Sequence, residues 1–411
     1  MEIPGSVPQA ASSLDRVLKP VIAELGGWVR ATPGTLSLAQ GMVGWSPPDG
    51  VVSALAEALQ DPDPGLHRYG AVQGEPPLLD AIQRHLGMHH HLDLAGSRLW
   101  VTAGSNMAFS AMAQVICGAG AADAAEVILP LPYYFNHVMA VQLAGGVAVP
   151  VDAGLVPDPE RLGAAITPRT RAIVTVSPNN PSGVVMPQPV LAAINRLCAA
   201  RGLFHLHDEA YEHFVHGPTP HWSPSSQAGA GAHTISLFSL SKAYGLAGWR
   251  LGYGVVPAQL LPGLAQVQDT VLICPPRLTQ AAAVAALAAG SGWCSPRIAA
   301  LSGLQQQLIA AVAQAHASGL PVRLLAEPDG AFYGLLALEP EASQRLSAAG
   351  VDVRTLMVRL AAQHGVACVS GDGFGLGGHA LRLSTGMVDS PTLAVALERL
   401  FAGLRELLGE A

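Results

Sequence analysis

Residues 238–252 read FSLSKAYGLAGWRLG, a segment that places a single lysine, Lys242, among apolar residues and glycines. The chain has 22 basic residues, and only Lys19 and Lys242 are lysines. A desolvated lysine amine can lose its proton and condense with a carbonyl to form an imine, whereas a guanidinium cannot. From this segment alone, Lys242 is either a reactive amine or an ordinary surface lysine, and burial would distinguish the two.

Strands and helices alternate around this segment. Apolar runs predict strands at 98–104, 126–130, 171–176, 203–207 and 234–238, and stretches with helical spacing lie between them, such as 105–117 and 187–201. Units of this length predict an α/β fold with a mostly parallel sheet covered by helices on both faces. Ligands bind at the carboxyl ends of the strands in such sheets. The polar residues that follow these strands are Ser105, Asn180, Asp208, Tyr211, Ser239 and Lys242.

The rest of the chain predicts further helices and a smaller α+β part. Helical spacing is present at 13–30, 278–317, 352–364 and 391–408. Residues 373–378 match G-x-G-x-x-G, but the strand-like run 380–384 follows in place of a helix, so we do not interpret them as a dinucleotide site. Arg382 lies within that apolar run. A buried arginine needs a carboxylate partner, which could come from the protein or from a substrate.

Composition limits the class of protein. Half of the residues are hydrophobic (50%) and few are charged (12%), which is typical of a compact, well-buried enzyme. The net charge of −7 gives no basic surface for nucleic acid. No apolar run is long enough for a membrane span, and residues 1–16 lack a secretory pattern. Together with five dispersed cysteines, these features lead us to expect a cytoplasmic protein without disulfides.

Two glycine-containing turns and one histidine run are candidate binding sites. Gly104-Ser105-Asn106 precedes a helix and is either a phosphate cradle or an ordinary helix cap. Gly41 either lets a ligand approach the backbone or simply forms a turn. His89-His90-His91 has polar neighbours and no partner cluster in the sequence, so we interpret it as a solvated helix end and expect no metal site.

Taken together, the motifs GSN, PYYFNH, SPNNPSG, DEAY, SLSKAYGLAGWRLGY and ALRLS resemble, in this order, those of the class I/II aminotransferase family. This family consists of pyridoxal-phosphate enzymes of fold type I, and the resemblance extends over nearly the full length. It implies that Lys242 binds the cofactor as an imine and shuttles a proton, and that Asp208 pairs with the pyridine nitrogen.

The resemblance also implies roles for the surrounding residues. His137 would hydrogen-bond Asp208, the ring of Tyr134 would stack on the cofactor, and Asn180 and Tyr211 would bind its phenolic oxygen. The substrate carboxylate would be held by Arg382, with Gly41 and Asn180 assisting, and the Asn180-Pro181 bond would be cis. The phosphate would be bound by Gly104, Ser105, Asn106, Ser239 and Arg250, with Tyr69 reaching the phosphate of a neighbouring subunit.

Two positions depart from the family pattern. Arg277 stands where many relatives have a small hydroxyl residue. It could bind a second negative group of the substrate, the partner's phosphate, or a surface carboxylate, since an arginine fork suits all three. His207 interrupts an apolar strand directly before Asp208, and we interpret it as a core histidine.

The resemblance implies a homodimer with shared active sites. We expect a large cofactor domain over residues 50–290 and a small domain formed by residues 1–49 and 291–411. The expected reaction transfers an amino group between an L-amino acid and a 2-oxo acid. A pyridoxal-phosphate-dependent lyase, cyclase or oxidase acting on an amino acid is the alternative, because the same residues serve those reactions. A non-catalytic, cofactor-binding regulator is the other alternative, but it would not need Lys242, Asp208 and Arg382 together.

Overall fold

The computed structural model describes residues 12–409 except 20, 63, 93 and 119–122. Within this part of the chain, seven strands form the largest sheet, in the order β2-β8-β7-β6-β5-β3-β4. They are β2 (Ser97–Thr102), β3 (Glu126–Pro130), β4 (Val147–Val151), β5 (Thr170–Val176), β6 (Phe204–Asp208), β7 (Thr234–Ser239) and β8 (Gly252–Pro257). Within this sheet β8 alone runs opposite to the other six strands. The predicted α/β class with a mostly parallel sheet is confirmed.

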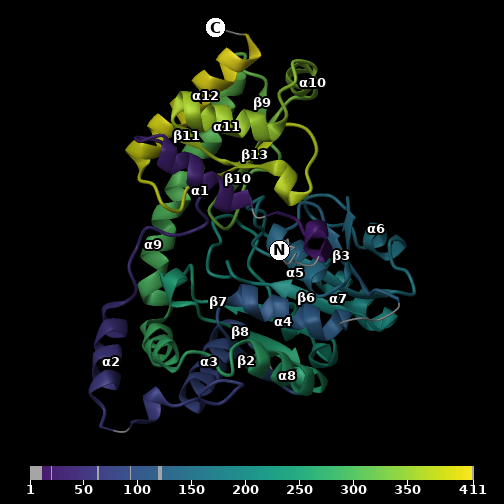
Figure 1. Cartoon of the computed structure of the whole chain (residues 1–411), viewed down its shortest axis with the longest axis vertical. Coiled ribbons are helices and arrows are strands. Elements are labelled where there is room, and N and C mark those ends of the chain that lie inside the picture. The colour runs from purple at the N-terminus through teal and green to yellow at the C-terminus, as the bar shows by residue number, and fades with distance from the viewer. Residues whose placement is uncertain (1–11, 20, 63, 93, 119–122, 410–411) are drawn as a thin grey trace, which may run out of the picture.

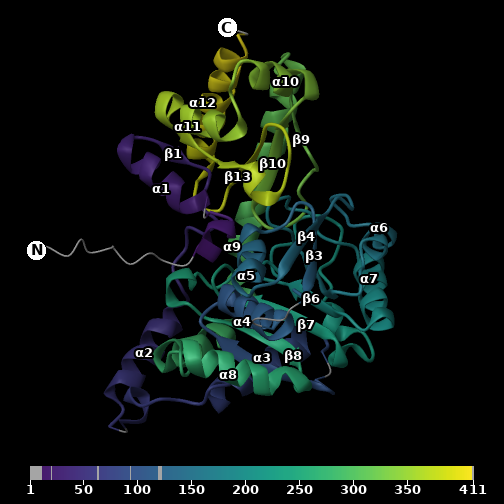
Figure 2. The ribbon, with the colours of Figure 1, turned by 45° about the vertical axis from the view of Figure 1, so that its right-hand side comes forward.

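Helices cover both faces of this sheet, because successive strand residues point to opposite sides. In β3, Val127 and Leu129 pack toward one group of helices and Ile128 toward another. The first group is α4 (Ser105–Cys117), α5 (Phe135–Leu143) and α8 (Leu261–Val271), and the second is α6 (Pro159–Ala164) and α7 (Gln188–Arg201). Near β2, β7 and β8, the second face is covered by α3 (Pro76–His89) and α9 (Arg277–Ala317) (Figure 2).

A smaller group of elements lies beyond one edge of this layer (Figure 1). Its four-stranded antiparallel sheet has the order β12-β13-β10-β9. The strands are β9 (Val322–Leu324), β10 (Tyr333–Leu338), β12 (Val369–Ser370) and β13 (Ala380–Ser384), and the helices are α1 (Val21–Ala31), α10 (Pro340–Ala348), α11 (Val353–His364) and α12 (Ser390–Leu408). Strand β1 (Leu36–Ser37) pairs in parallel with β11 (Val366–Ala367). Segments from both ends of the chain therefore share this hydrophobic core.

Helix α9 connects the two groups (Figure 1). Its first half packs with α2 (Asp49–Gln60) and α3, and residues such as Leu308 and Val312 in its second half belong to the core of the smaller group. The helix is bent at Gly290, which has φ 66° and ψ −170°. Side-chain-bearing residues rarely adopt this conformation, so the bend depends on glycine.

One helix prediction is wrong at its start. A continuous helix was expected over 13–30, but the chain forms a 3₁₀ turn at Ser12–Arg16 and α1 begins at Val21. Pro20 directly precedes α1 in the sequence, and a proline disrupts a helix interior but is tolerated at a helix start. Among the described residues, every helix is too short or too polar to cross a membrane.

Candidate active site

A cavity of about 480 Å³ lies where the carboxyl ends of the central strands meet the smaller group of elements. Polar residues from strand ends and loops far apart in the sequence converge on it. The predicted site residues that line it are Gly41, Ser105, Asn106, Tyr134, Asn180, Asp208, Tyr211, Ser239, Lys242, Arg250 and Arg382. The predicted convergence at this edge of the sheet is therefore present in the structure.

Lys242 follows β7 and is half-buried in the cavity wall. Its Nζ donates a hydrogen bond to the Gly41 carbonyl oxygen. Burial, together with the positive charges of Arg382 and Arg250, lowers the pKa of Lys242 to about 8, although the Asp208 carboxylate opposes this shift. The neutral, nucleophilic amine is thus far more accessible near neutral pH than in a solvent-exposed lysine. The surface-lysine interpretation of this residue is wrong.

Asp208 ends β6 and is held from two sides. Its Oδ2 lies 3.1 Å from His137 Nε2, and its Oδ1 accepts a hydrogen bond of 3.0 Å from the Ala210 N–H. His137 lies on α5, where its ring stacks on Phe109 with centroids 3.9 Å apart. The ring of Tyr134 meets His137 edge-on at 5.2 Å. These contacts fix the orientation of a buried carboxylate that faces the cavity.

The opposite end of the cavity is suited to an anion. Gly104, with φ 90°, caps the N-terminus of α4, where backbone N–H groups have no partner in the helix. A Cβ at Gly104 would lie 2.5 Å from Nη2 of Arg250, and one at Gly252 would lie 2.6 Å from the Ser105 nitrogen. The close packing of arginine, hydroxyl groups and helix N-terminus thus depends on glycine. This arrangement is typical of a phosphate site.

Arg382 on β13 is almost completely buried, with 2% of its surface exposed. Its Nη1 donates to Asn180 Oδ1 at 2.9 Å, and its Nη2 donates to the Ala39 carbonyl oxygen at 2.6 Å. No carboxylate of the described residues forms an ion pair with it, and its buried Nε has no hydrogen-bond partner there. A buried cation without a protein counter-charge is costly. The arginine is thus available to a carboxylate that enters the cavity.

Tyr333 on β10 is a cavity residue that sequence reasoning missed. Its hydroxyl lies 2.6 Å from the hydroxyl of Tyr211, and the Arg382 guanidinium lies over its ring, 4.6 Å from the centroid. Burial and the neighbouring Tyr333 raise the pKa of Tyr211 well above its usual range. A Cβ at Gly41 would lie 2.6 Å from the Tyr333 hydroxyl, so this position requires glycine. The glycine-flanked GAFYG run at 330–334 was the signal that could have indicated this residue. Gln40, Met42 and Asn136 also line the cavity and were not predicted.

Two predicted residues lie away from this cavity. Tyr69 is 79% exposed on a loop, and Arg277 at the start of α9 pairs with Glu75 at a distance of 3.0 Å. The two are neighbours, since a Cβ at Gly70 would lie 3.1 Å from Arg277 Cδ. Within this chain, neither side chain contributes to the site around Lys242.

Two further predictions, for one peptide bond and for His207, are confirmed. The Asn180-Pro181 bond is cis, as expected. His207 is a fully buried core residue, as expected, with Nδ1 2.6 Å from Thr175 Oγ1, and burial lowers its pKa to about 3.

The interpretation of residues 89–91 as a solvated helix end without partners is wrong for His90. Its side chain is only 7% exposed and contacts Glu212, with the rings of His85 and His221 nearby. The sequence did not reveal this cluster because Glu212 and His221 lie more than a hundred residues after His85 and His90.

Comparison with known proteins agrees with this geometry. The family model described as "Aminotransferase class I and II" matches residues 36–400. An aromatic aminotransferase of Arabidopsis thaliana is 32% identical, with 95% of this chain and 94% of that protein covered. An aspartate/prephenate aminotransferase of Thermus thermophilus is also 32% identical, with 89% of each chain covered. The solved aspartate aminotransferase from Thermus thermophilus with maleate superposes with a TM-score of 0.84 at 28% identity, covering 97% of this chain and all of that one.

The sheet and the cavity define a fold type I transferase that depends on pyridoxal phosphate. The chain belongs to the class I and II aminotransferases, which transfer an amino group between an amino acid and a 2-oxo acid. The residues present fit this cofactor. A buried amine, a buried carboxylate and an anion site built around Gly104 occupy one cavity, matching the aldehyde, ring nitrogen and phosphate of pyridoxal phosphate.

Proposed function

We propose that the residues around Lys242 divide into three sets, which bind the cofactor, transfer the proton and hold the substrate carboxylate. The observation that carries this proposal is that Lys242, Asp208 and Arg382 line the same cavity. When bound there, pyridoxal phosphate supplies the electron sink that stabilises negative charge on the substrate Cα. The remaining chemistry belongs to side chains of this chain.

The cofactor would be held at both ends. Ser105, Ser239 and Arg250, with the backbone of Gly104 and Asn106, would bind the phosphate by charge-assisted hydrogen bonds. Asp208, oriented by His137, would keep the pyridine nitrogen protonated. Tyr134 would contact the ring face, and Asn180 and Tyr211 would donate to the phenolic oxygen. The hydrogen bonds that Asn180 and Tyr211 make to Arg382 and Tyr333 support their orientation toward the cavity.

Lys242 would serve first as the attachment point of the cofactor and then as the base that moves the proton at Cα. A general base works best when its pKa is close to the working pH. The pKa of about 8 for Lys242 meets that condition, and burial is its main cause. Because its Nζ already reaches the Gly41 carbonyl oxygen, the amine can be held away from the substrate or released toward it.

Arg382 would bind the α-carboxylate of the amino acid through its guanidinium fork, with Asn180 and the Gly41 backbone beside it. A second cation, which a dicarboxylic substrate would need for its side-chain carboxylate, has less support than this role of Arg382. The cations among the residues that line the cavity are Lys242, Arg250 and Arg382, and Arg277 pairs with Glu75 elsewhere. Substrate side chains would instead meet Met42, Tyr134 and Tyr333. Within one chain, this environment favours amino acids with one carboxylate over dicarboxylic ones.

A half-reaction assay tests this proposal. Purified protein loaded with pyridoxal phosphate is mixed with single amino acids, and its absorbance is followed while 2-oxo acid, ammonia and thiol are measured. We expect conversion to the pyridoxamine form with equimolar 2-oxo acid, and faster conversion with monocarboxylic than with dicarboxylic amino acids. Release of ammonia or thiol without that conversion would contradict the proposal and favour the lyase alternative.

We further propose a homodimer in which Tyr69 binds the phosphate in the partner's site. The loop of Tyr69 and the segment before α9 pack together, since the Gly70 N–H donates to Cys274 Sγ at 3.2 Å. Exposed apolar side chains surround this contact, including Val271, Ile273 and Leu278. A subunit interface would remove such a patch from water. Arg277 would lie at this interface, with its charge balanced by Glu75.

Mixing two defective variants tests the shared site. Neither Lys242→Ala nor Tyr69→Ala homodimers contain a complete site. A mixed dimer would contain one complete site, with Lys242 from one subunit and Tyr69 from the other. We expect the mixture to regain tight cofactor binding in up to half of the sites of the mixed dimers, measured by titration after separation of differently tagged chains. The reference is a mixture of Lys19→Ala and Tyr69→Ala chains. In its mixed dimers, one site is complete and the other lacks only Tyr69. Absence of recovery in verified mixed dimers, or a monomer by light scattering, would count against the shared site.

The domain division at residues 50 and 290 is likewise a proposal. It is supported by the bend of α9 at Gly290 and by the pairing of β1 with β11, which joins the N-terminal segment to the C-terminal part. A cytoplasmic role in amino acid metabolism is proposed from the sequence, and cell fractionation would test the location.

A further inference from the structure

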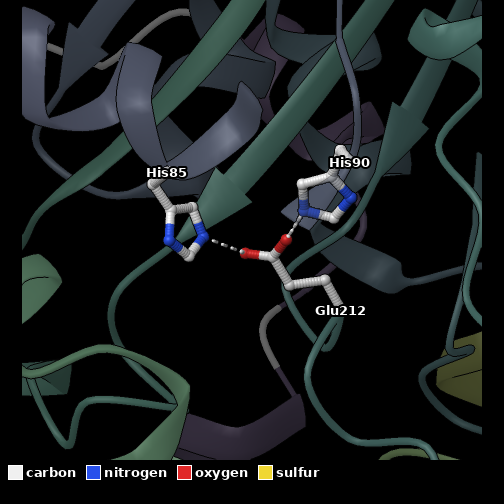
Figure 3. Close-up of side chains that lie close together, drawn as sticks. All are labelled: His85, His90 and Glu212. Carbon is white, nitrogen blue, oxygen red and sulfur yellow. Dashed lines mark hydrogen bonds and ion pairs between the residues drawn. The ribbon is translucent and has the colours of Figure 1, made fainter. Parts of the chain in front are cut away.

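A buried group of histidines surrounds one glutamate behind the active-site loop. We call it the Glu212 cluster, and it consists of His85, His90, Glu212 and His213. His85 and His90 lie at the C-terminal end of α3, while Glu212 and His213 follow β6 in the chain. Figure 3 shows the rings of His85 and His90 approaching the two carboxylate oxygens of Glu212 from different sides. Glu212 itself has a side chain only 6% exposed.

The three histidines of this cluster lie at different distances from the Glu212 carboxylate. His90 Nε2 forms a short contact with Glu212 Oε2. By contrast, His85 Nε2 lies 4.0 Å from Oε1, and His213 Nε2 lies 3.6 Å from the same oxygen. Neither of these two nitrogens has a hydrogen-bond partner among the described residues, although both are buried. Two ring nitrogens are thus aimed at one carboxylate oxygen from distances too long for a hydrogen bond. Unsatisfied buried polar atoms of this kind are rare and require an explanation.

We propose that the Glu212 cluster binds a divalent zinc-type cation through His85 Nε2, His90 Nε2 and a Glu212 carboxylate oxygen, with His213 beside it. One ring nitrogen of each histidine and one carboxylate oxygen of Glu212 lie within 4.8 Å of one another. Two ligands bonded to zinc at about 2.0–2.1 Å in tetrahedral geometry are separated by about 3.3–3.4 Å. The 4.0 Å separation between His85 Nε2 and Oε1 therefore needs a contraction of well under an ångström, and the short contact of His90 Nε2 with Oε2 needs to lengthen. Rotation about side-chain bonds can supply both changes.

The ligand chemistry selects the class of cation. Imidazole nitrogens with one carboxylate suit zinc and related transition metals, whereas calcium and magnesium prefer sets made only of oxygen. A neighbouring set, His90 with Glu209 and His221, also has metal-compatible spacing. Its carboxylate is already satisfied, because Glu209 accepts from Ser223 Oγ at 2.7 Å and lies 2.9 Å from His221 Nε2. In the Glu212 cluster, by contrast, only Oε2 contacts a histidine closely, while His85 Nε2 and His213 Nε2 lie 4.0 and 3.6 Å from Oε1, so this oxygen has free ligand capacity.

A cavity connects the proposed site to solvent. The position of the site in the fold also gives the cation a role. His213 lines a cavity of about 400 Å³ that opens between this loop and α9. Within six residues of the chain, Asp208 and Tyr211 face the active site while Glu212 and His213 face the cluster. A bound cation would tie the end of α3 to the loop that positions these two active-site residues. Its role is structural, because no ligand touches the cavity that holds Lys242.

Metal uptake by the cofactor-loaded enzyme tests the proposal. Enzyme freed of metal by a chelator is titrated with Zn²⁺ by calorimetry, and bound zinc is counted by elemental analysis after gel filtration. We expect one zinc ion per chain and a rise in the melting temperature on binding. His85→Gln and Glu212→Gln should each weaken binding by at least about 10–100-fold, the loss typical even for residues that only support metal ligands. His316→Gln, at an exposed position on α9, is the matched control and should bind zinc as the wild type does.

Binding of Co²⁺ provides a second readout, since cobalt in a tetrahedral site absorbs visible light with an intensity that hydrated cobalt lacks. The bands should appear in the wild type and in His316→Gln and be absent from His85→Gln. If Glu212→Gln fails to fold, His85→Gln decides the question, because the His85 nitrogen that it removes makes no hydrogen bond to the described part of the chain. A wild type that takes up no zinc overturns the proposal, and so does uptake that is equal in the wild type and in His85→Gln.

Discussion

Lys242→Ala is expected to abolish turnover and covalent attachment of the cofactor together. Loss of the proton-transferring group alone should lower the rate of the half-reaction by about 10²–10⁴-fold. The effect should be large because no other amine lines the cavity in the described part of the chain, and because the pKa of about 8 makes Lys242 unusually able to lose its proton. Stopped-flow absorbance with a reactive amino acid measures the rate.

The matched control for this variant is Lys19→Ala, since Lys19 is the only other lysine in the sequence. Borohydride reduction of the yellow wild-type protein should fix the cofactor to the peptide that contains Lys242, as read by mass spectrometry. Lys19→Ala should give the same labelled peptide and the same rate as the wild type. Labelling at any other residue, or a Lys242→Ala protein that retains the wild-type rate, would refute the role proposed for this lysine.

Arg382→Lys is expected to lower kcat/KM for amino acids by about 10²–10³-fold. Lysine keeps the positive charge but loses the fork, and charge-assisted hydrogen bonds contribute about 1.5–3 kcal/mol each. Arg382 has Asn180 on one side and the Ala39 carbonyl oxygen on the other, so a shorter, single-ended cation cannot replace its geometry. Steady-state kinetics with one amino acid and saturating 2-oxo acid measure the change.

A comparison of substrates separates carboxylate binding from general damage to the site. Each amino acid is paired with the amine that lacks its carboxylate, and the ratio of the two kcat/KM values is determined. This ratio should collapse in Arg382→Lys and remain unchanged in Arg201→Lys, whose side chain is exposed at the end of α7. An equal loss for the amino acid and the amine would show that Arg382 supports the fold and does not bind the carboxylate. Thermal melting of both variants checks that they are folded.

The strand ends were predictable because local sequence decides them. Apolar runs bounded by glycine, proline or polar residues mark β3 and β13 to the residue, and β2, β5, β6 and β7 within one or two residues. Strand β8, which runs back antiparallel between β2 and β7, was not predicted. In a parallel sheet these ends share one edge, so the proximity of Asp208, Asn180 and Lys242 followed from the order of strands and helices. The first helix was placed less well, since the break near Pro20 interrupts an otherwise helical pattern.

Contacts between distant segments could not be predicted in the same way. Tyr333 reaches Tyr211 across 122 positions, and Arg382 reaches Ala39 across 343. The first contact depends on how the smaller group of elements packs on the large sheet, and the second on how the N-terminal segment joins that smaller group. The partners of His90 were missed for the same reason, because Glu212 lies 122 positions away. A histidine run looks alike in sequence whether water or a buried carboxylate surrounds it.

The sequence by itself thus determined the α/β class and the reactive residues of the family motifs, because hydrophobic periodicity and motif order are local properties of the chain. Tertiary structure decided which of those residues share a cavity, the lowered pKa of Lys242, the exposure of Tyr69 and the Glu212 cluster. Burial and electrostatic environment arise from packing between segments far apart in the chain, so they exist only once the chain is folded.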